Sequence, residues 1–209
     1  MRHALIAVTL VLFGFTLSTA LAKDQPTVAD LEAAITAADA DAPCAEVNLP
    51  LAKLKLKKAR LLATDAWYAG IDPSDVIAEG LRLVQMIDRG EAYFPPKGEL
   101  SELAYIARND GTVQPYYLHI PEDYTPDRDW PLIVFLHGYV PSISVVDPWV
   151  LGDEVCNIAE RHGAILLLPY GRRNTDFQGV GEVDIYRAIE EMKLGYRIDD
   201  ERIYLSGVS

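Results

Sequence analysis

The stretch Ile203-Tyr204-Leu205-Ser206-Gly207-Val208-Ser209 joins a short apolar strand to the tripeptide Gly-Val-Ser. A serine on a sharp turn after a strand is lifted clear of the sheet, and crowding in such a turn requires glycine two residues before it. Gly207 meets that requirement, so Ser209 is a candidate nucleophile. Because Gly-x-Ser is common by chance, its meaning depends on the rest of the sequence.

The residues before this strand alternate between apolar runs and helical patterns. The run 132–136 is unbroken, as expected of a strand covered on both faces, and 164–168 is a second such run. Apolar residues recur with helical spacing over 149–162 and 182–196. In the second helix the predicted apolar side comprises Val183, Tyr186, Ile189 and Met192. This alternation predicts an α/β fold, with a mostly parallel sheet and helices on both faces.

The sequence upstream of these elements divides into a hairpin and a helical part. Strands predicted at 103–108 and 113–120 flank Asn109-Asp110-Gly111, and Asp-Gly favours a tight turn. Before them, 23–90 reads as helices interrupted by a loop at 41–50, and it contains no recognisable chemistry. The predicted organisation is a signal segment (1–22), a helical N-terminal segment (23–97) and a partial α/β domain (98–209).

The first residues have the pattern of a secretory signal peptide. Arg2 precedes the apolar run 4–17, and small residues then end in Ala20-Leu21-Ala22. The run is too short to span a bilayer comfortably, which disfavours a membrane anchor. We therefore expect cleavage after Ala22, a secreted or periplasmic protein, and no membrane association once the signal is removed.

Charge and cysteine content restrict the possible partners. The net charge is -12, and removal of the signal with its Arg2 leaves 18 basic and 31 acidic residues, or -13. Such a surface argues against nucleic-acid binding, which needs basic patches. Cys44 and Cys156 are able to pair in an exported protein, but spacing alone leaves that pairing open. The sequence has no metal-ligand spacing, and we expect no metal and no cofactor.

A second chemical motif follows the strand at 132–136. Leu136-His137-Gly138-Tyr139 lies at its carboxyl end, the sheet edge where α/β proteins bind ligands. The backbone N–H of Gly138 or Tyr139 is a candidate donor to an oxyanion. We expect His137 to stabilise the loop rather than to act as a base. The loop residues Phe177-Gln178-Gly179 lie at the same edge, where they contact substrate or form a plain surface loop.

These motifs together give a family resemblance. From about Gly98 to Ser209 the chain resembles secreted α/β-hydrolase esterases and prolyl oligopeptidase-type serine hydrolases, on the residues 110–116, 132–139, 181–184 and 198–209. The resemblance implies the N-terminal half of an α/β-hydrolase fold, with Ser209 as nucleophile and an oxyanion donor near Tyr139. It places Asp184 and Asp199 at structural positions.

The resemblance also implies that part of the catalytic machinery is missing. In this family the triad acid and histidine follow the serine, and a Gly-x-Ser-x-Gly motif ends two residues beyond it. The chain therefore reads as a serine hydrolase truncated at its nucleophile elbow. We expect this chain alone to be inactive and to fold poorly, because the strand 203–205 would be a bare apolar edge.

Three functions remain open at this stage. The preferred one is a carboxylic ester hydrolase that forms an acyl-enzyme on a small-molecule or polymer-linked ester. A prolyl oligopeptidase-type peptidase is the close alternative, although 23–90 is too short and too helical for the propeller that such enzymes carry. The third is a non-catalytic exported binding protein on a degenerate hydrolase scaffold. The oligomeric state and the substrate stay undetermined.

Overall fold

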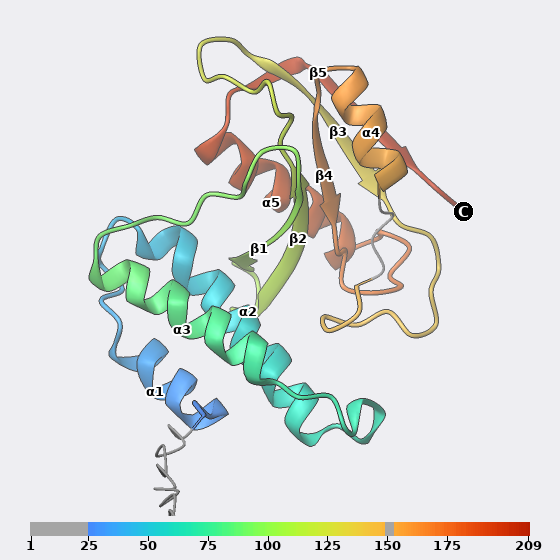
Figure 1. Ribbon diagram of the computed structural model, residues 1–209. Coiled ribbons are helices and arrows are strands. Elements are labelled where there is room, and N and C mark those ends of the chain that lie inside the picture. The colour runs from blue at the N-terminus through green and yellow to red at the C-terminus, as the bar shows by residue number, and fades with distance from the viewer. Residues whose placement is uncertain (1–24, 149–152) are drawn as a thin grey trace, which may run out of the picture.

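The computed structural model of the protein describes residues 25–148 and 153–209 (Figure 1). The predicted signal segment 1–22 and the first residues of the helix predicted at 149–162 lie outside these residues. The described elements, in chain order, are α1 (Val28–Ala37), α2 (Ala45–Thr64), the 3-10 helix η1 (Ala66–Tyr68), α3 (Ser74–Asp88), β1 (Leu100–Ile106), β2 (Val113–His119), β3 (Trp130–Leu136), α4 (Asp153–Arg161), β4 (Ile165–Pro169), α5 (Val180–Gly195) and β5 (Ile198–Gly207).

The strands form one five-stranded sheet in the order β1-β2-β4-β3-β5. The strands β3, β4 and β5 are parallel, which confirms the predicted strand–helix alternation and the α/β fold. The predicted hairpin is also present: β1 and β2 are antiparallel, and Gly111 takes a φ of +69° in the turn between them. Because β2 also runs antiparallel to β4, the hairpin gives the sheet an antiparallel edge.

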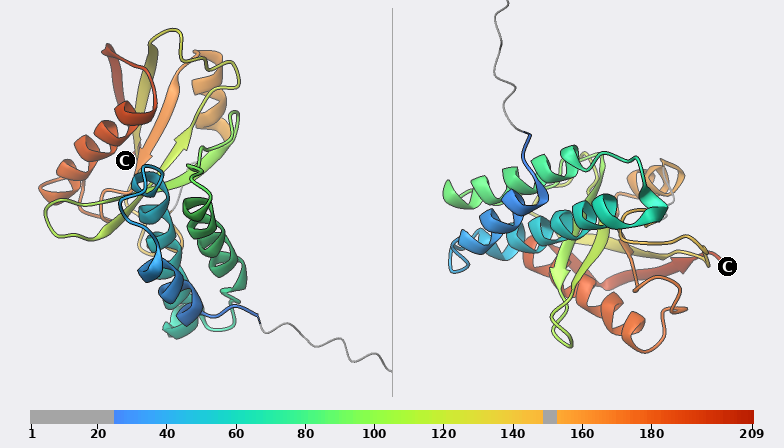
Figure 2. Two further views of the ribbon diagram at one scale, coloured as in Figure 1. Left: turned by 90° about the vertical axis from the view of Figure 1, so that its left-hand side faces the viewer. Right: turned by 90° about the horizontal axis from the view of Figure 1, so that it is seen from below.

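Helices cover both faces of the parallel strands (Figure 2). Every residue of β4 is buried, and successive side chains of a strand point to opposite faces. Leu166 packs with Ala159 of α4, while Leu167 packs with Ala188 and Met192 of α5. The continuous apolar run at 164–168 is therefore explained by burial on two sides.

The helical N-terminal part packs against the hairpin end of the sheet (Figures 1 and 2). Leu51 and Leu54 of α2 share one hydrophobic cluster with Leu83 of α3 and Ala104 of β1. A buried ionic cluster reinforces this contact, because Glu102 of β1 pairs with two lysines of α2, Lys55 and Lys58. Although burial opposes ionisation, the two ammonium charges hold the pKa of Glu102 below its usual value.

The loop predicted at 41–50 is largely wrong. Helix α2 starts at Ala45 and contains Pro50, which cannot donate its hydrogen bond to the preceding turn. The fully buried Asn48 fixes this turn instead. Its amide makes three hydrogen bonds to backbone groups of α3 and of the segment after it: the carbonyls of Leu83 (3.3 Å) and Glu91 (2.9 Å) and the N–H of Tyr93 (2.8 Å). These tertiary bonds override the local preference of proline.

The predicted inner side of α5 is partly wrong. Met192 is buried and Ile189 packs on the core, but Val183 and Tyr186 are exposed. The helix is rotated so that Asp184 points inward, where its carboxylate is 2% exposed and pairs with Arg172. A pattern based on apolar residues alone could not anticipate that a carboxylate occupies the inner face.

None of the helices among the described residues is long and apolar enough to cross a membrane. No disulfide joins Cys44 to Cys156, which lie in separate hydrophobic clusters, and the Cys44 thiol lies 3.8 Å from the carbonyl oxygen of Ile87.

The strand β5 lies at one edge of the sheet and pairs with β3 alone among the described strands. Tyr204 and Leu205 expose large apolar side chains along it, and Val208 does so directly after it. An unpaired apolar edge is a template for pairing with another chain.

We expect Leu205→Lys to increase the monomeric fraction at equal protein concentration, because a charge on an edge strand opposes strand pairing between molecules. Size-exclusion chromatography with light scattering measures that fraction. Leu194→Lys is the matched control, since Leu194 is equally exposed, at 68%, but lies on α5. Equal effects of the two substitutions would assign self-association to general hydrophobicity rather than to the edge.

Candidate active site

The candidate site lies where the parallel strands end. Leu136 is the register partner of Gly207, so the residues that follow β3 and β5 lie side by side. The N–H of Val208 donates to the carbonyl of Leu136 at 3.2 Å. A pocket of about 610 Å³ opens there, lined by 136–139, by 205–209, and by Arg173, Asn174, Asp176 and Phe177 from the loop after β4. This volume is in the range of small-molecule sites.

Ser209 has the backbone conformation expected of a serine raised on a strained turn. Its φ is +73°, in the left-handed region that residues with a side chain rarely adopt. The turn is tight enough to require Gly207, because a Cβ there would lie 2.9 Å from the carbonyl oxygen of Leu136. Strain of this kind persists where the surroundings fix it, and it is typical of functional turns.

The structure brings the other predicted site residues to Ser209. A Cβ on Gly138 would lie 3.0 Å from the Cβ of Ser209 and 3.0 Å from the carbonyl oxygen of Val208, so the two loops are in contact. The side chain of Tyr139 is exposed. Within the described part of the chain, no group accepts a hydrogen bond from the N–H of Gly138 or of Tyr139. Both N–H groups therefore remain candidates for an oxyanion, as the sequence predicts.

The contacts of His137 are those of a loop-stabilising residue. Its Nε2 lies 3.0 Å from the carbonyl oxygen of Tyr170 and its Nδ1 lies 2.8 Å from that of Gly138. A neutral imidazole donates to one of these carbonyls, because it carries a single N–H. The ring also packs on Phe177, with 4.9 Å between ring centroids. Among the described residues, no histidine and no carboxylate is hydrogen-bonded to Ser209.

The loop after β4 is the feature that sequence reasoning missed. Four of its residues with side chains have positive φ: Arg172 (57°), Arg173 (72°), Asp176 (53°) and Phe177 (51°). Each such residue costs on the order of 1 kcal/mol, so the loop needs strong external fixation. Asn174 provides part of it, because its amide accepts from the N–H of Val140 (3.0 Å) and donates to the carbonyl of the same residue (2.8 Å).

Arg172 supplies the remaining fixation through two carboxylates. Its Nε donates to Asp184 at 2.8 Å, and its Nη1 pairs with Asp110 in the hairpin turn. The bond from Arg172 holds the pKa of Asp110 well below its usual range, and the bond to Asp110 raises the pKa of Arg172. Asp184 is thus structural, as the resemblance implies. The carboxylate of Asp199 pairs with Arg202 at 2.6 Å.

Of the three loop residues suggested for substrate contact, Phe177 lines the pocket, whereas Gln178 and Gly179 do not. A Cβ on Gly171 would lie 2.3 Å from the ring of Phe177, so this glycine leaves the space that the ring occupies. Arg173, Asn174 and Asp176 line the pocket without having been predicted. Gly171 and Gly179 flank a run of polar residues in the sequence. Glycines placed in this way mark a loop of unusual backbone geometry, and this was the sequence signal for these pocket residues.

Comparisons with known proteins give similarity at the level of structure. No family model matches the chain, and no curated protein does. Among solved structures, a thermostable esterase is similar over 53% of this chain and 34% of its own, at 23% identity and a TM-score of 0.38. The CE1 ferulic acid esterase of Anaeromyces mucronatus is similar over 53% and 49%, at 20% identity and a TM-score of 0.38.

A fluorophosphonate-binding serine hydrolase of Staphylococcus aureus is also similar, over 54% of this chain and 48% of its own, at 15% identity and a TM-score of 0.41. The chain therefore spans between about a third and a half of the length of these structures. The activities in their names belong to those proteins.

The contact between Gly138 and Ser209 yields a test. We expect Gly138→Ala to slow fluorophosphonate labelling of the protein by about tenfold, because the added methyl displaces Ser209 and misplacement of a reacting group is costly. Time-resolved labelling measures the rate. Gly195→Ala is the control, since a Cβ at Gly195 meets no atom within 4 Å. An unchanged rate for Gly138→Ala would show that this contact does not position the serine.

Proposed function

We propose that this chain carries the nucleophile of a serine hydrolase that acts on carboxylic esters through an acyl-enzyme. The observation that supports it is the left-handed Ser209 held against Gly138 at the carboxyl ends of two parallel strands. In this proposal the Oγ of Ser209 attacks the ester carbonyl, and the alkoxy group leaves as an alcohol. The N–H of Gly138 or Tyr139 stabilises the developing oxyanion.

A base must accept the proton of Ser209, and its nearest described neighbours do not supply one. His137 is engaged with backbone carbonyls. His119 is the last residue of β2, and its Nε2 lies 2.9 Å from a carboxylate oxygen of Glu160 in α4. We propose that the whole protein provides the histidine, its acid partner and a second oxyanion N–H from residues after Ser209. This arrangement is the one that the family resemblance implies.

The proposed substrate is a small-molecule or polymer-linked ester. The pocket beside Ser209 combines the ring of Phe177 with the polar side chains of Arg173 and Asp176, a mixture suited to a ligand with apolar and polar parts. The described part of the chain ahead of the sheet consists of helices rather than the blades of a propeller, which favours an esterase over an oligopeptidase. Export after cleavage at Ala22 is part of the same proposal.

Substitution of the serine tests the proposal. In the full-length protein we expect Ser209→Ala to abolish fluorophosphonate labelling and to lower hydrolysis of p-nitrophenyl esters by a factor on the order of 10⁴ or more. Ser206→Ala is the matched control, because Ser206 also lines the pocket but lies within β5.

Three results would contradict the proposal in different ways. Labelling retained by Ser209→Ala would move the nucleophile to another residue. Hydrolysis of peptides in preference to esters would favour the peptidase. A full-length wild-type protein that is folded, unlabelled and inactive would favour the non-catalytic binding protein.

A further inference from the structure

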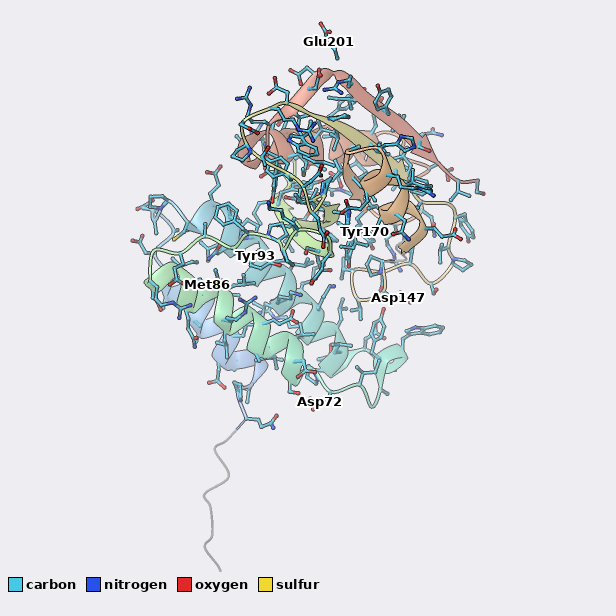
Figure 3. All side chains as sticks on the ribbon, turned by 45° about the horizontal axis from the view of Figure 1, so that its top comes forward. Asp72, Met86, Tyr93, Asp147, Tyr170 and Glu201 are labelled. Carbon is cyan, nitrogen blue, oxygen red and sulfur yellow. The ribbon has the colours of Figure 1, made fainter. Side chains whose placement is uncertain are left out.

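A second hollow, of about 320 Å³, lies between α2 and the loop that follows β4. Its polar lining comes from α2, η1, β2 and two loops: Lys57, Asp65, Tyr68, Gln114, Ser144, Tyr170, Arg172 and Arg173. Figure 3 shows Tyr170 between the helical layer and the sheet. The hollow is separate from the Ser209 pocket, although Arg173 lines both. We call it the α2 pocket.

Two hydroxyl groups of the α2 pocket are available as donors. The Oγ of Ser144 accepts hydrogen bonds from the N–H groups of Val146 (3.2 Å) and Asp147 (3.0 Å), which occupy its two lone pairs. Its own proton therefore goes to the Oη of Tyr68, 2.6 Å away, and the O–H of Tyr68 is left to donate elsewhere.

Tyr170 contributes the second hydroxyl. Burial raises the pKa of Tyr170 to about 12, so its phenol stays protonated at neutral pH. None of the described residues makes a hydrogen bond with this hydroxyl. The hydroxyl is therefore open to a hydrogen bond with a ligand or with water.

Two of the three cations that line the pocket have no ion-pair partner, although the Nε of Arg173 donates to the carbonyl of Ile143 at 2.9 Å. Lys57 and Arg173 form no ion pair with any described residue. Burial, and next the charge of Arg172, lower the pKa of Lys57, and the carboxylate of Asp110 offsets part of this effect. Arg172 itself is neutralised by Asp110 and Asp184, as described above.

One acidic residue, Asp65, also lines the pocket. Its carboxylate accepts from the N–H of Trp67 at 2.9 Å, and so caps the 3-10 helix η1. Beside this carboxylate the pocket presents the ammonium of Lys57, the guanidinium of Arg173 and the two phenol hydroxyls. Lys57 and Arg173 thus outnumber the one carboxylate that lines the pocket, and their charges favour an anionic ligand.

We propose that the α2 pocket binds the anionic group, a carboxylate or a phosphate, of a small molecule through Lys57, Arg173 and the hydroxyls of Tyr68 and Tyr170. The ammonium and the guanidinium are donors only, the phenol hydroxyls are able to donate as well, and charged donors form their strongest hydrogen bonds with ionised oxygens. The volume suits a compact ligand rather than a polymer. Binding is independent of whether Ser209 is a nucleophile, so the two proposals fail or succeed separately.

Isothermal titration calorimetry of the full-length protein tests the proposal with three probes: succinate, inorganic phosphate and the uncharged succinamide. We expect at least one anion to bind, with an affinity that falls as salt is added, and succinamide not to bind. The comparison of succinate with phosphate identifies the anionic group. Absence of binding by both anions to folded protein would overturn the proposal.

Substitutions locate the binding. We expect Lys57→Gln to weaken anion binding by about tenfold, because it removes a charge-assisted hydrogen bond, and Tyr68→Phe to weaken it by a smaller factor. Lys53→Gln is the matched control, since Lys53 lies on the same helix but is exposed and does not line the α2 pocket.

Folding of each variant is checked by thermal unfolding. Lys57 forms no ion pair with a described residue, so we expect Lys57→Gln and Lys53→Gln to unfold at similar temperatures. Equal anion affinity of Lys57→Gln and Lys53→Gln would place binding outside the α2 pocket and overturn the proposal.

Discussion

The parallel pairing of β3 with β5 is the constraint on which the candidate site depends. Leu136 is the register partner of Gly207, which fixes the offset between the two strands. That offset sets where the residues after each strand lie relative to one another. A slip of two residues would separate Gly138 from Ser209 by more than a side-chain length, since each residue of a strand advances by about 3.3 Å. Glycine at 207 and 138 permits the close approach, because a side chain at either position would meet the neighbouring backbone.

The loop after β4 depends on a second constraint, the guanidinium of Arg172. Its planar fork joins a carboxylate from the hairpin turn, Asp110, to one from α5, Asp184, so three separate parts of the fold meet at one side chain. Lysine would not reproduce this geometry, because it presents a single charged group. The same loop forms one wall of the Ser209 pocket and one wall of the α2 pocket, so its rigidity matters for both.

The sequence predicted the parts of the structure that follow from periodicity. The strand–helix alternation, the Asp-Gly hairpin and the contact between the His-Gly and Gly-Val-Ser segments all reflect local patterns that parallel-sheet topology brings to one edge. Errors arose where a long-range polar contact overrode the local pattern. Asn48 holds a helical turn around Pro50, and Asp184 rotates α5 so that Tyr186 faces outward. Neither partner could be identified from its sequence neighbourhood.

The connections of Arg172 also bear on the order in which the protein folds. Its contact with Asp110 closes a segment of 62 residues, and ordering so long a segment is entropically expensive until the sheet between them has formed. Before that contact forms, no interaction with Asp110 offsets the conformational free-energy cost of the left-handed residues in the loop. The loop should therefore reach its final shape only after the hairpin, β4 and α5 have docked. The walls of both pockets would then be among the last parts of the molecule to form on folding and among the first to be lost on unfolding.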